Sequence, residues 1–222
     1  MGAENGELES VRVTRMLRDD IVLGRRPPGS RLVERDLATE LRVSRLPVRE
    51  AIRALVNEGI VVARPRSWAI VREFTLRDVR DFAEVRAAIE TEVFILATER
   101  HDHEGIEQLR LLVEREERAA SAGDGDVARG LSGAFHEHMV VLAGNDMLSE
   151  LASIYATRLK WVFGQHGDLE AMAAEHRRLY EAILARDVEL VKTLVVRHLE
   201  QGAAAAAKKL SDVASPTRAT EE

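Results

Sequence analysis

Two histidines, His176 and His198, lie on the apolar faces of predicted helices. The stripe that contains His176 comprises Met172, Leu179 and Ile183, and the stripe that contains His198 comprises Val191, Leu194 and Val195. A single imidazole in such a place is usually a hydrogen-bonded core residue, but two on consecutive antiparallel helices can share a partner. Neutral imidazole is a common protein ligand for divalent metals. The pattern indicates a metal site, with a metal-free polar pocket lined by the same histidines as the alternative.

Arg86 also lies in an apolar stripe, which comprises Val79, Phe82, Ile89 and Val93. A guanidinium is costly to bury without a partner. Glu90, one helical turn further on, is a structural partner, whereas the carboxylate of an effector, gripped in a bidentate clamp, is a functional one. The two interpretations are compatible if they apply to different states of the protein.

A third charged pattern lies in the N-terminal half, where Arg45, Arg49 and Arg53 recur every four residues. This spacing places them in one stripe of a helix, although like charges so arranged repel each other. Ser44 is the predicted N-cap, with a hydroxyl that accepts from a backbone N–H of the first turn. Pro47 falls inside that turn, where proline is tolerated. The stripe is either a solvated face or a surface that binds a polyanion.

The surrounding elements favour the polyanion. A short amphipathic helix over 32–43 precedes the arginine helix, and the pair forms a helix-turn-helix spanning about 34–53. A further helix is predicted over 10–23. Two short strands over 60–63 and 68–71 flank a basic turn, in which Arg66 is a candidate DNA contact. Residues 8–74 are therefore predicted to form a winged helix-turn-helix DNA-binding domain.

The charge distribution agrees with this assignment. The net charge of the chain is −6, but residues 25–72 carry eleven arginines and five acidic residues, a net charge of +6. A basic module joined to an acidic domain is typical of nucleic-acid binding. Aromatic residues make up only 4%, which argues against stacking on single strands. The absence of cysteine and of a long apolar run suits a cytoplasmic protein without a membrane segment.

The rest of the chain is predicted to be almost entirely helical. Helices are expected near 76–99, 104–121, 126–143, 146–163, 168–186 and 188–210. The fold class is therefore mainly α, with an N-terminal winged helix-turn-helix and a C-terminal all-α bundle of six or seven helices over 75–210. Residues 211–222 are expected to form a disordered tail. The bundle is the expected effector-binding and dimerisation domain.

The N-terminal part resembles the GntR family of bacterial transcription regulators. The resemblance rests on Gly29-Ser30-Arg31-Leu32 and on Val43-Ser44-Arg45-Leu46-Pro47-Val48-Arg49-Glu50-Ala51-Ile52. It implies a homodimer on a palindromic operator in double-stranded DNA, with Arg35, Arg45 and Arg49 reaching the DNA and Ser44 near a phosphate. Two positions depart from the family pattern: Leu46 replaces the usual threonine, and Trp68 replaces the usual glycine of the wing.

The C-terminal part resembles the FCD domain, the ligand-binding half of the FadR subfamily. The resemblance rests on Val85-Arg86-Ala87-Ala88-Ile89-Glu90, on Phe135-His136 followed by Ala143-Gly144-Asn145, and on His176 and His198. It implies that His136 is the third metal ligand, although helical periodicity alone favours His138. Ser132 stands where metal-binding members have Asp or Asn, so three imidazoles would hold the ion, zinc or nickel, with water or effector completing its shell.

Together these features predict a sequence-specific transcription regulator, most often a repressor in this family, that responds to a small organic acid bound near Arg86 and Ser132. Three histidines could also hold the metal of a hydrolase. The sequence contains no His-Glu-x-x-His motif and no evident general base, and a third of it is a DNA-binding module. We therefore expect a regulator rather than an enzyme.

Overall fold

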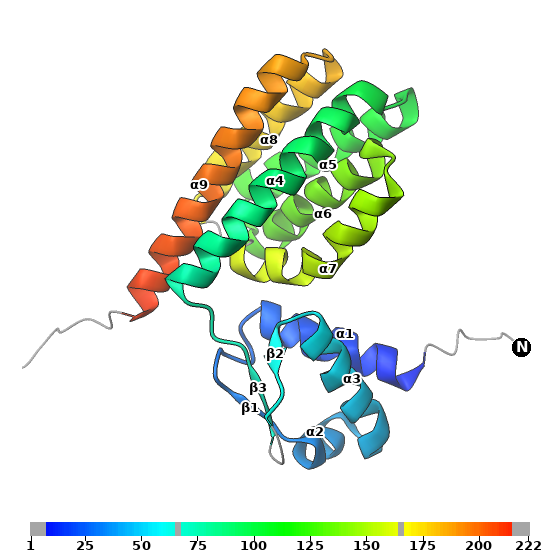
Figure 1. Cartoon of the computed structure of the whole chain (residues 1–222), viewed down its shortest axis with the longest axis vertical. Coiled ribbons are helices and arrows are strands. Elements are labelled where there is room, and N and C mark those ends of the chain that lie inside the picture. The colour runs from blue at the N-terminus through cyan, green and yellow to red at the C-terminus, as the bar shows by residue number, and fades with distance from the viewer. Residues whose placement is uncertain (1–7, 65–67, 164–166, 215–222) are drawn as a thin grey trace, which may run out of the picture. The chain divides into compact units, whose positions relative to one another are not determined.

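The computed structural model describes residues 8–64, 68–163 and 167–214. The chain divides into two compact units (Figure 1). The first unit runs to Phe74 and also includes Ile154–Trp161, and the second contains the remaining helical residues from Thr75 onward. The described helices include none that is long and apolar enough to cross a membrane.

The first unit is a winged helix. It contains α1 (Glu9–Val22), α2 (Glu34–Leu41) and α3 (Arg45–Asn57), together with the short strands β1 (Arg31–Leu32), β2 (Val61–Val62) and β3 (Ala69–Val71). The strands form an antiparallel sheet in the order β1-β3-β2. The two wing strands were predicted from the sequence. The first strand was missed, because Leu32 had been assigned to the start of the following helix.

Apolar side chains at helical spacing hold this unit together. The fully buried side chains of α1 and α3 are Val13, Leu17, Ile21, Val48 and Leu55. They pack with Leu32 and Val71 of the sheet, with Leu37 of α2, and with Ile60 and Trp161. Each such side chain contributes about 1.5–3 kcal/mol when it leaves water. The sequence between these positions is polar, so the charged residues of α3 are left on the surface.

Six helices make up the remainder of the described chain. They are α4 (Leu76–Arg100), α5 (His103–Ser121), α6 (Gly125–Ala143), α7 (Asp146–Phe163), α8 (Leu169–Leu184) and α9 (Val188–Ala214). These bounds agree closely with the predicted segments, and the all-α prediction is confirmed. Helix α9 continues four residues beyond the predicted end at 210. The alanine-rich segment, Lys208, Lys209 and Leu210 have good helix propensity, and the helix extends from them into residues of weaker propensity. The rest of the predicted tail lies outside the described residues.

Side-chain caps define where several bundle helices begin. Thr75 and Asp78 form a capping box at the start of α4. The carboxylates of Asp102, Asp124 and Asp168 accept from backbone N–H groups in the first turns of α5, α6 and α8. Such caps satisfy amides that would otherwise lack a partner. They fix the register of the helices that carry the histidines.

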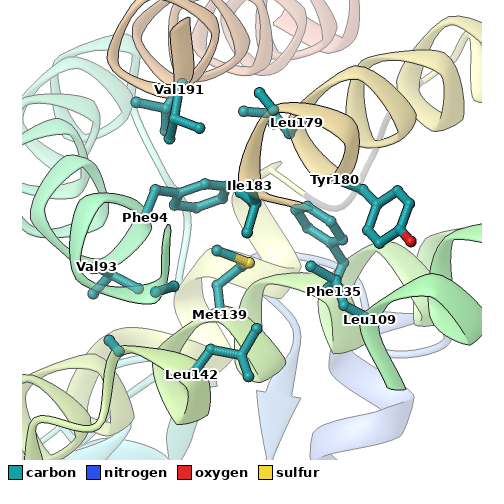
Figure 2. Close-up of a cluster of buried hydrophobic side chains, with 14 of the residues drawn as sticks. Val93, Phe94, Leu109, Phe135, Met139, Leu142, Leu179, Tyr180, Ile183 and Val191 are labelled. Carbon is teal, nitrogen blue, oxygen red and sulfur yellow. The ribbon is translucent and has the colours of Figure 1, made fainter. Parts of the chain in front are cut away.

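The core of the bundle lies between α4, α5, α6, α8 and α9. Figure 2 shows its aromatic centre, where Phe94 of α4 and Phe135 of α6 lie close together, with ring centroids 6.0 Å apart. Helix α4 packs against both α9 and α6, and α5 packs against α6 and α8. Phe135 is fully buried. The next residue on α6 is His136, so this core places a histidine at the edge of a dry, close-packed interior.

Candidate functional site

The arginines of α3 face a groove beside the wing. The groove is lined by α3, the start of α2 and the strands, and its charged members are Arg35, Arg45, Arg49, Arg53, Arg64 and Glu34. The predicted stripe of three arginines on α3 is exposed. A positive surface along the second helix of a helix-turn-helix suits the major groove of DNA. Arg66, also predicted to contact DNA, lies outside the described residues.

The start of α3 differs from the prediction in one respect. Ser44 occupies the N-cap position with extended backbone angles, but its side chain makes no capping hydrogen bond. A capping serine bonds the N–H of the second or third residue of the helix, and the third residue here is Pro47, which has no N–H. Leu46, the second residue, has an exposed fraction of 61%. The exposed hydroxyl of Ser44 and the apolar side chain of Leu46 therefore lie together at the tip of the helix.

In the bundle, three histidines from three helices converge. His136 of α6, His176 of α8 and His198 of α9 are all buried, and one ring nitrogen from each lies within 4.8 Å of the other two. The Nε2 atoms of His136 and His198 are 3.3 Å apart. Two ligands of a tetrahedral zinc ion, each about 2.0–2.1 Å from the metal, lie at about this separation. The side chain of His138 instead contacts the carbonyl of Gly105 on α5, at 2.8 Å.

Each histidine of this cluster has a glutamate on the opposite side of its ring. His176 Nδ1 donates to the carboxylate of Glu116, at 2.8 and 3.0 Å. His198 Nδ1 donates to Glu175 at 2.8 Å, and His136 Nδ1 lies 3.0 Å from Glu90 Oε2. A carboxylate accepts hydrogen bonds, so Nδ1 of His176 and of His198 carries the proton. In His136 the contact between Nδ1 and Glu90 lacks hydrogen-bond geometry, but its Nε2 accepts from Arg86, which places the proton on Nδ1 in this ring as well. This arrangement is typical of histidines that bind metals.

One inward nitrogen of the cluster, the buried His176 Nε2, has no hydrogen-bond partner among the described residues. The Nε2 atoms of His136 and His198 face each other, and two lone pairs at 3.3 Å repel unless a cation or a proton lies between them. Phe135 stacks on His176, with 4.1 Å between the ring centroids, and so holds the ring in place. Three neutral imidazoles are a donor set that suits zinc and nickel, so the residues fit a divalent metal.

Arg86 reaches this cluster from α4. It is 3% exposed, and its Nε donates to Glu90 Oε1 at 2.7 Å. Its Nη2 lies 3.3 Å from His136 Nε2, which must accept because a guanidinium only donates. Burial opposes ionisation of Glu90, but Arg86 and His136 outweigh it and lower the pKa of Glu90 to about 2. The structural partner predicted for Arg86 is therefore confirmed.

Electrostatics keep the cluster ready for a cation. Burial lowers the pKa of His136 below its ordinary value, despite the opposing effect of Glu90. His136 is consequently neutral near pH 7, and its Nε2 lone pair can bind a cation once the guanidinium of Arg86 releases it. Burial also raises the pKa of Glu175, although neighbouring positive charges oppose this. Ser132, one turn before His136 on α6, is buried and supplies no carboxylate to the cluster.

Comparison with known proteins agrees with both halves of this description. Residues 9–71 match the model of bacterial regulatory proteins of the gntR family. Residues 81–201, more than half of the chain, match the model of the FCD domain. The chain belongs to the GntR family. Its N-terminal unit is thus a DNA-binding module, and its histidines lie in an FCD domain.

Relatives of this GntR-family regulator extend over nearly its whole length. It is 31% identical to the HTH-type transcriptional regulator YdhC of Bacillus subtilis over 77% of this chain and 79% of that one. It is 28% identical to the "Probable D-xylose utilization operon transcriptional repressor" of Paenarthrobacter nicotinovorans over 90% and 91%. Its fold matches that of E. coli McbR/YncC with a TM-score of 0.79 at 22% identity, over 91% and 99% of the two chains. The two sequence relatives are named as transcription regulators, and the chain is a regulator rather than an enzyme.

Several site residues of this regulator were missed by reasoning from sequence. Glu116 is fully buried, and its position on the apolar stripe of Leu109 and Val113 was a usable signal. Glu175 immediately precedes His176 and so faces a different direction along its helix, which hides the link to His198 twenty-three residues later. Periodicity also pointed to His138, because a residue that faces a polar pocket weakens the apolar pattern of its own helix.

Proposed function

We propose that this GntR-family member is a cytoplasmic repressor of the FadR subfamily that binds a palindromic operator as a homodimer. In this proposal a small carboxylate effector enters a metal-containing pocket of the FCD domain and releases the protein from DNA. The observation that carries the effector half is the convergence of three Nε2 atoms whose opposite ring nitrogens are held by glutamates. The name of the D-xylose operon relative supports repression.

The pocket is suited to an anion. His136, His176 and His198 would hold a divalent ion such as zinc or nickel, and such an ion supplies a Lewis-acidic positive charge that favours a carboxylate. Arg86 supplies a second positive charge beside His136. The hydroxyl of Ser132, one turn before His136, can donate to a ligand. A carboxylate is the ligand class that matches these groups.

Arg86 provides a route from the pocket to the DNA-binding unit. It lies on α4, whose first residue, Leu76, follows the last wing strand after only four residues. An effector that pairs with Arg86 competes with Glu90 and His136 for the guanidinium and thereby favours a different position of α4. Allosteric coupling of about 1–3 kcal/mol is enough to release an operator. Two-fold symmetry of a homodimer would match the two half-sites of the operator.

Metal analysis and operator release together test this proposal. Purified protein should contain a divalent metal by elemental analysis, and a panel of small organic acids should include one that weakens operator binding. His176→Ala should remove both the metal and the response while leaving operator binding intact. The double variant Arg86→Met/Glu90→Gln, which removes both charges of the buried pair, should keep the metal but lose the response. Sedimentation of the full chain should give a dimer at micromolar concentration.

The outcomes separate the alternatives. An acid that acts equally well on metal-containing and chelator-treated protein would favour a metal-free effector pocket lined by the same histidines. Protein without metal whose acid response survives His176→Ala would remove the histidine cluster from the proposal. A monomer that binds a single half-site would remove the homodimer.

A further inference from the structure

One residue in the DNA-facing groove has the wrong charge for its surroundings. Glu34, the first residue of α2, is the single acidic side chain among the described residues that line the groove, which also include five arginines. A carboxylate facing DNA repels the phosphates and lowers affinity for any sequence. Glu34 therefore does not increase the general affinity of the groove for DNA, and its presence there needs another explanation.

The geometry of Glu34 indicates that contribution. Arg49 Nε donates to Glu34 Oε1 at 3.0 Å, and Arg49 Nη2 donates to Glu34 Oε2 at 2.9 Å. Because this contact has two points, it fixes both the position and the plane of the guanidinium. It occupies the edge formed by Nε and Nη2. The remaining N–H groups, on Nη1 and the outer side of Nη2, then point away from Glu34.

A second acid–arginine pair on the same helix lacks these features. Asp36 contacts Arg35 through a single hydrogen bond of 3.0 Å between adjacent residues. The two side chains are 73% and 61% exposed, against 49% for Arg49 and 35% for Glu34. This pair neutralises charge but does not fix the plane of an arginine on the recognition helix. It therefore serves as a matched control.

We propose that Glu34 is a positioning residue that presents Arg49 to a guanine and so confers sequence specificity at the expense of general affinity for DNA. This inference rests on the proposed binding of a specific operator. A planar pair of arginine N–H groups matches O6 and N7 of guanine in the major groove, the commonest specific contact of arginine with a base. A prefixed guanidinium makes that contact with less ordering than a mobile one.

Glu34 stays ionised under working conditions, so the pair persists. The hydrogen bonds from Arg49 lower the pKa of Glu34 below its ordinary range, and the positive charges of Arg45 and Arg53 act in the same direction. Slight burial opposes them. Across neutral pH, the groove therefore combines arginines that attract phosphates with one arginine, Arg49, that a carboxylate holds at two points.

The test uses the full chain and an operator selected from random duplexes by the wild-type protein. The guanine that Arg49 contacts is the one whose replacement weakens wild-type binding but not Arg49→Ala binding. That guanine is then replaced by 7-deazaguanine, which lacks N7. Wild-type binding should fall about 10- to 100-fold for the loss of a bidentate base contact.

Three variants separate the effect of the charge of Glu34 on general DNA affinity from its effect on the position of Arg49. Glu34→Gln should bind random DNA more tightly than wild type, and its loss on the 7-deaza operator should shrink to less than about threefold. Glu34→Asp keeps the charge but is one methylene shorter, so it should lose discrimination without gaining affinity for random DNA. Asp36→Asn should gain affinity for random DNA but discriminate as wild type does. Circular dichroism would check that each variant is folded.

Two results would distinguish failure of the inference about Glu34 from failure of the proposed operator binding. If Glu34→Gln and Glu34→Asp both keep wild-type discrimination against the 7-deaza operator, the inference is overturned while operator binding stands. If the wild-type protein selects no sequence from random duplexes, the proposed operator binding itself is overturned.

Discussion

Replacing Arg86 with methionine should destabilise the FCD domain strongly, independently of any ligand. Methionine has a similar length and no charge, so the change leaves the Glu90 carboxylate buried without its guanidinium; Arg86 and Glu90 are 3% and 4% exposed. Removing one partner of a buried ion pair costs about 3–5 kcal/mol. The loss should therefore appear as a lower free energy of unfolding of the domain.

The pKa of Glu90 provides a second estimate of this cost. The pKa falls from 4.5 to about 2 in the folded protein, because Arg86 and His136 together outweigh burial. Each unit corresponds to about 1.4 kcal/mol, so the ionised carboxylate contributes roughly 3 kcal/mol at pH 7 through both partners, with Arg86 as the larger source. The folded-state pKa is depressed, so this stabilisation is complete above pH 4.5 and is lost as pH falls towards 2. At pH 3.5 it should have declined to roughly 2 kcal/mol.

Urea unfolding of chelator-treated protein, followed by circular dichroism at pH 7 and 3.5, measures both values. Arg77→Met is the matched control, because Arg77 and Asp81 form the same i, i+4 pair on α4 but are 83% and 64% exposed; its cost should be below about 0.5 kcal/mol. The double variant Arg86→Met/Glu90→Gln should recover at least half of the loss. A cost for Arg86→Met below about 1 kcal/mol, or one that is equal at both pH values, would refute the reasoning.

Three further predictions concern the winged helix. Arg45→Ala and Arg49→Ala should each weaken operator binding by about 1–3 kcal/mol by fluorescence anisotropy, and an equal loss on random DNA would mark a phosphate contact instead. Leu46 should contact a thymine methyl, so uracil at one position of a single half-site should weaken wild-type binding about fourfold but leave Leu46→Ala binding unchanged. Glu58→Gln should cost about 1–2 kcal/mol at pH 7 through loss of the Arg18 pair, since Arg18 and Thr157 outweigh burial and lower the pKa of Glu58. That cost should decline as pH falls below about 4.5, and a difference in unfolding free energy that does not change with pH would contradict it.

Helical periodicity and capping residues were sufficient to predict most of this fold. The bundle helices begin at Thr75, Asp102, Asp124 and Asp168, each of which caps its helix through a local side-chain contact. Such contacts depend on neighbours in the sequence. The strand β1 depends instead on pairing with β3, nearly forty residues later. Because β1 contains only two residues, it is too short to show the alternation of apolar and polar residues that would predict a strand.

The candidate site was predictable only in part for the same reason. His176 and His198 break apolar stripes on their own helices, which is a local signal. The choice of His136 over His138 came from family resemblance, and the structure brings His136 into the cluster. The glutamates behind the rings depend on contacts between helices, such as the one from α5 to α8, which no local pattern encodes.

Pro47, three residues after Ser44, leaves the N-terminus of α3 without a side-chain cap. A helix start normally satisfies its own first amides, but Pro47 cannot donate to the Ser44 hydroxyl, and no side-chain cap is present there. The positive end of the helix dipole is consequently left to an external anion. A DNA phosphate seated at Ser44 would complete the cap, so the first turn of α3 should fray in the free protein and become ordered on the operator. Amide hydrogen exchange at Leu46 would then report DNA binding as a local folding event.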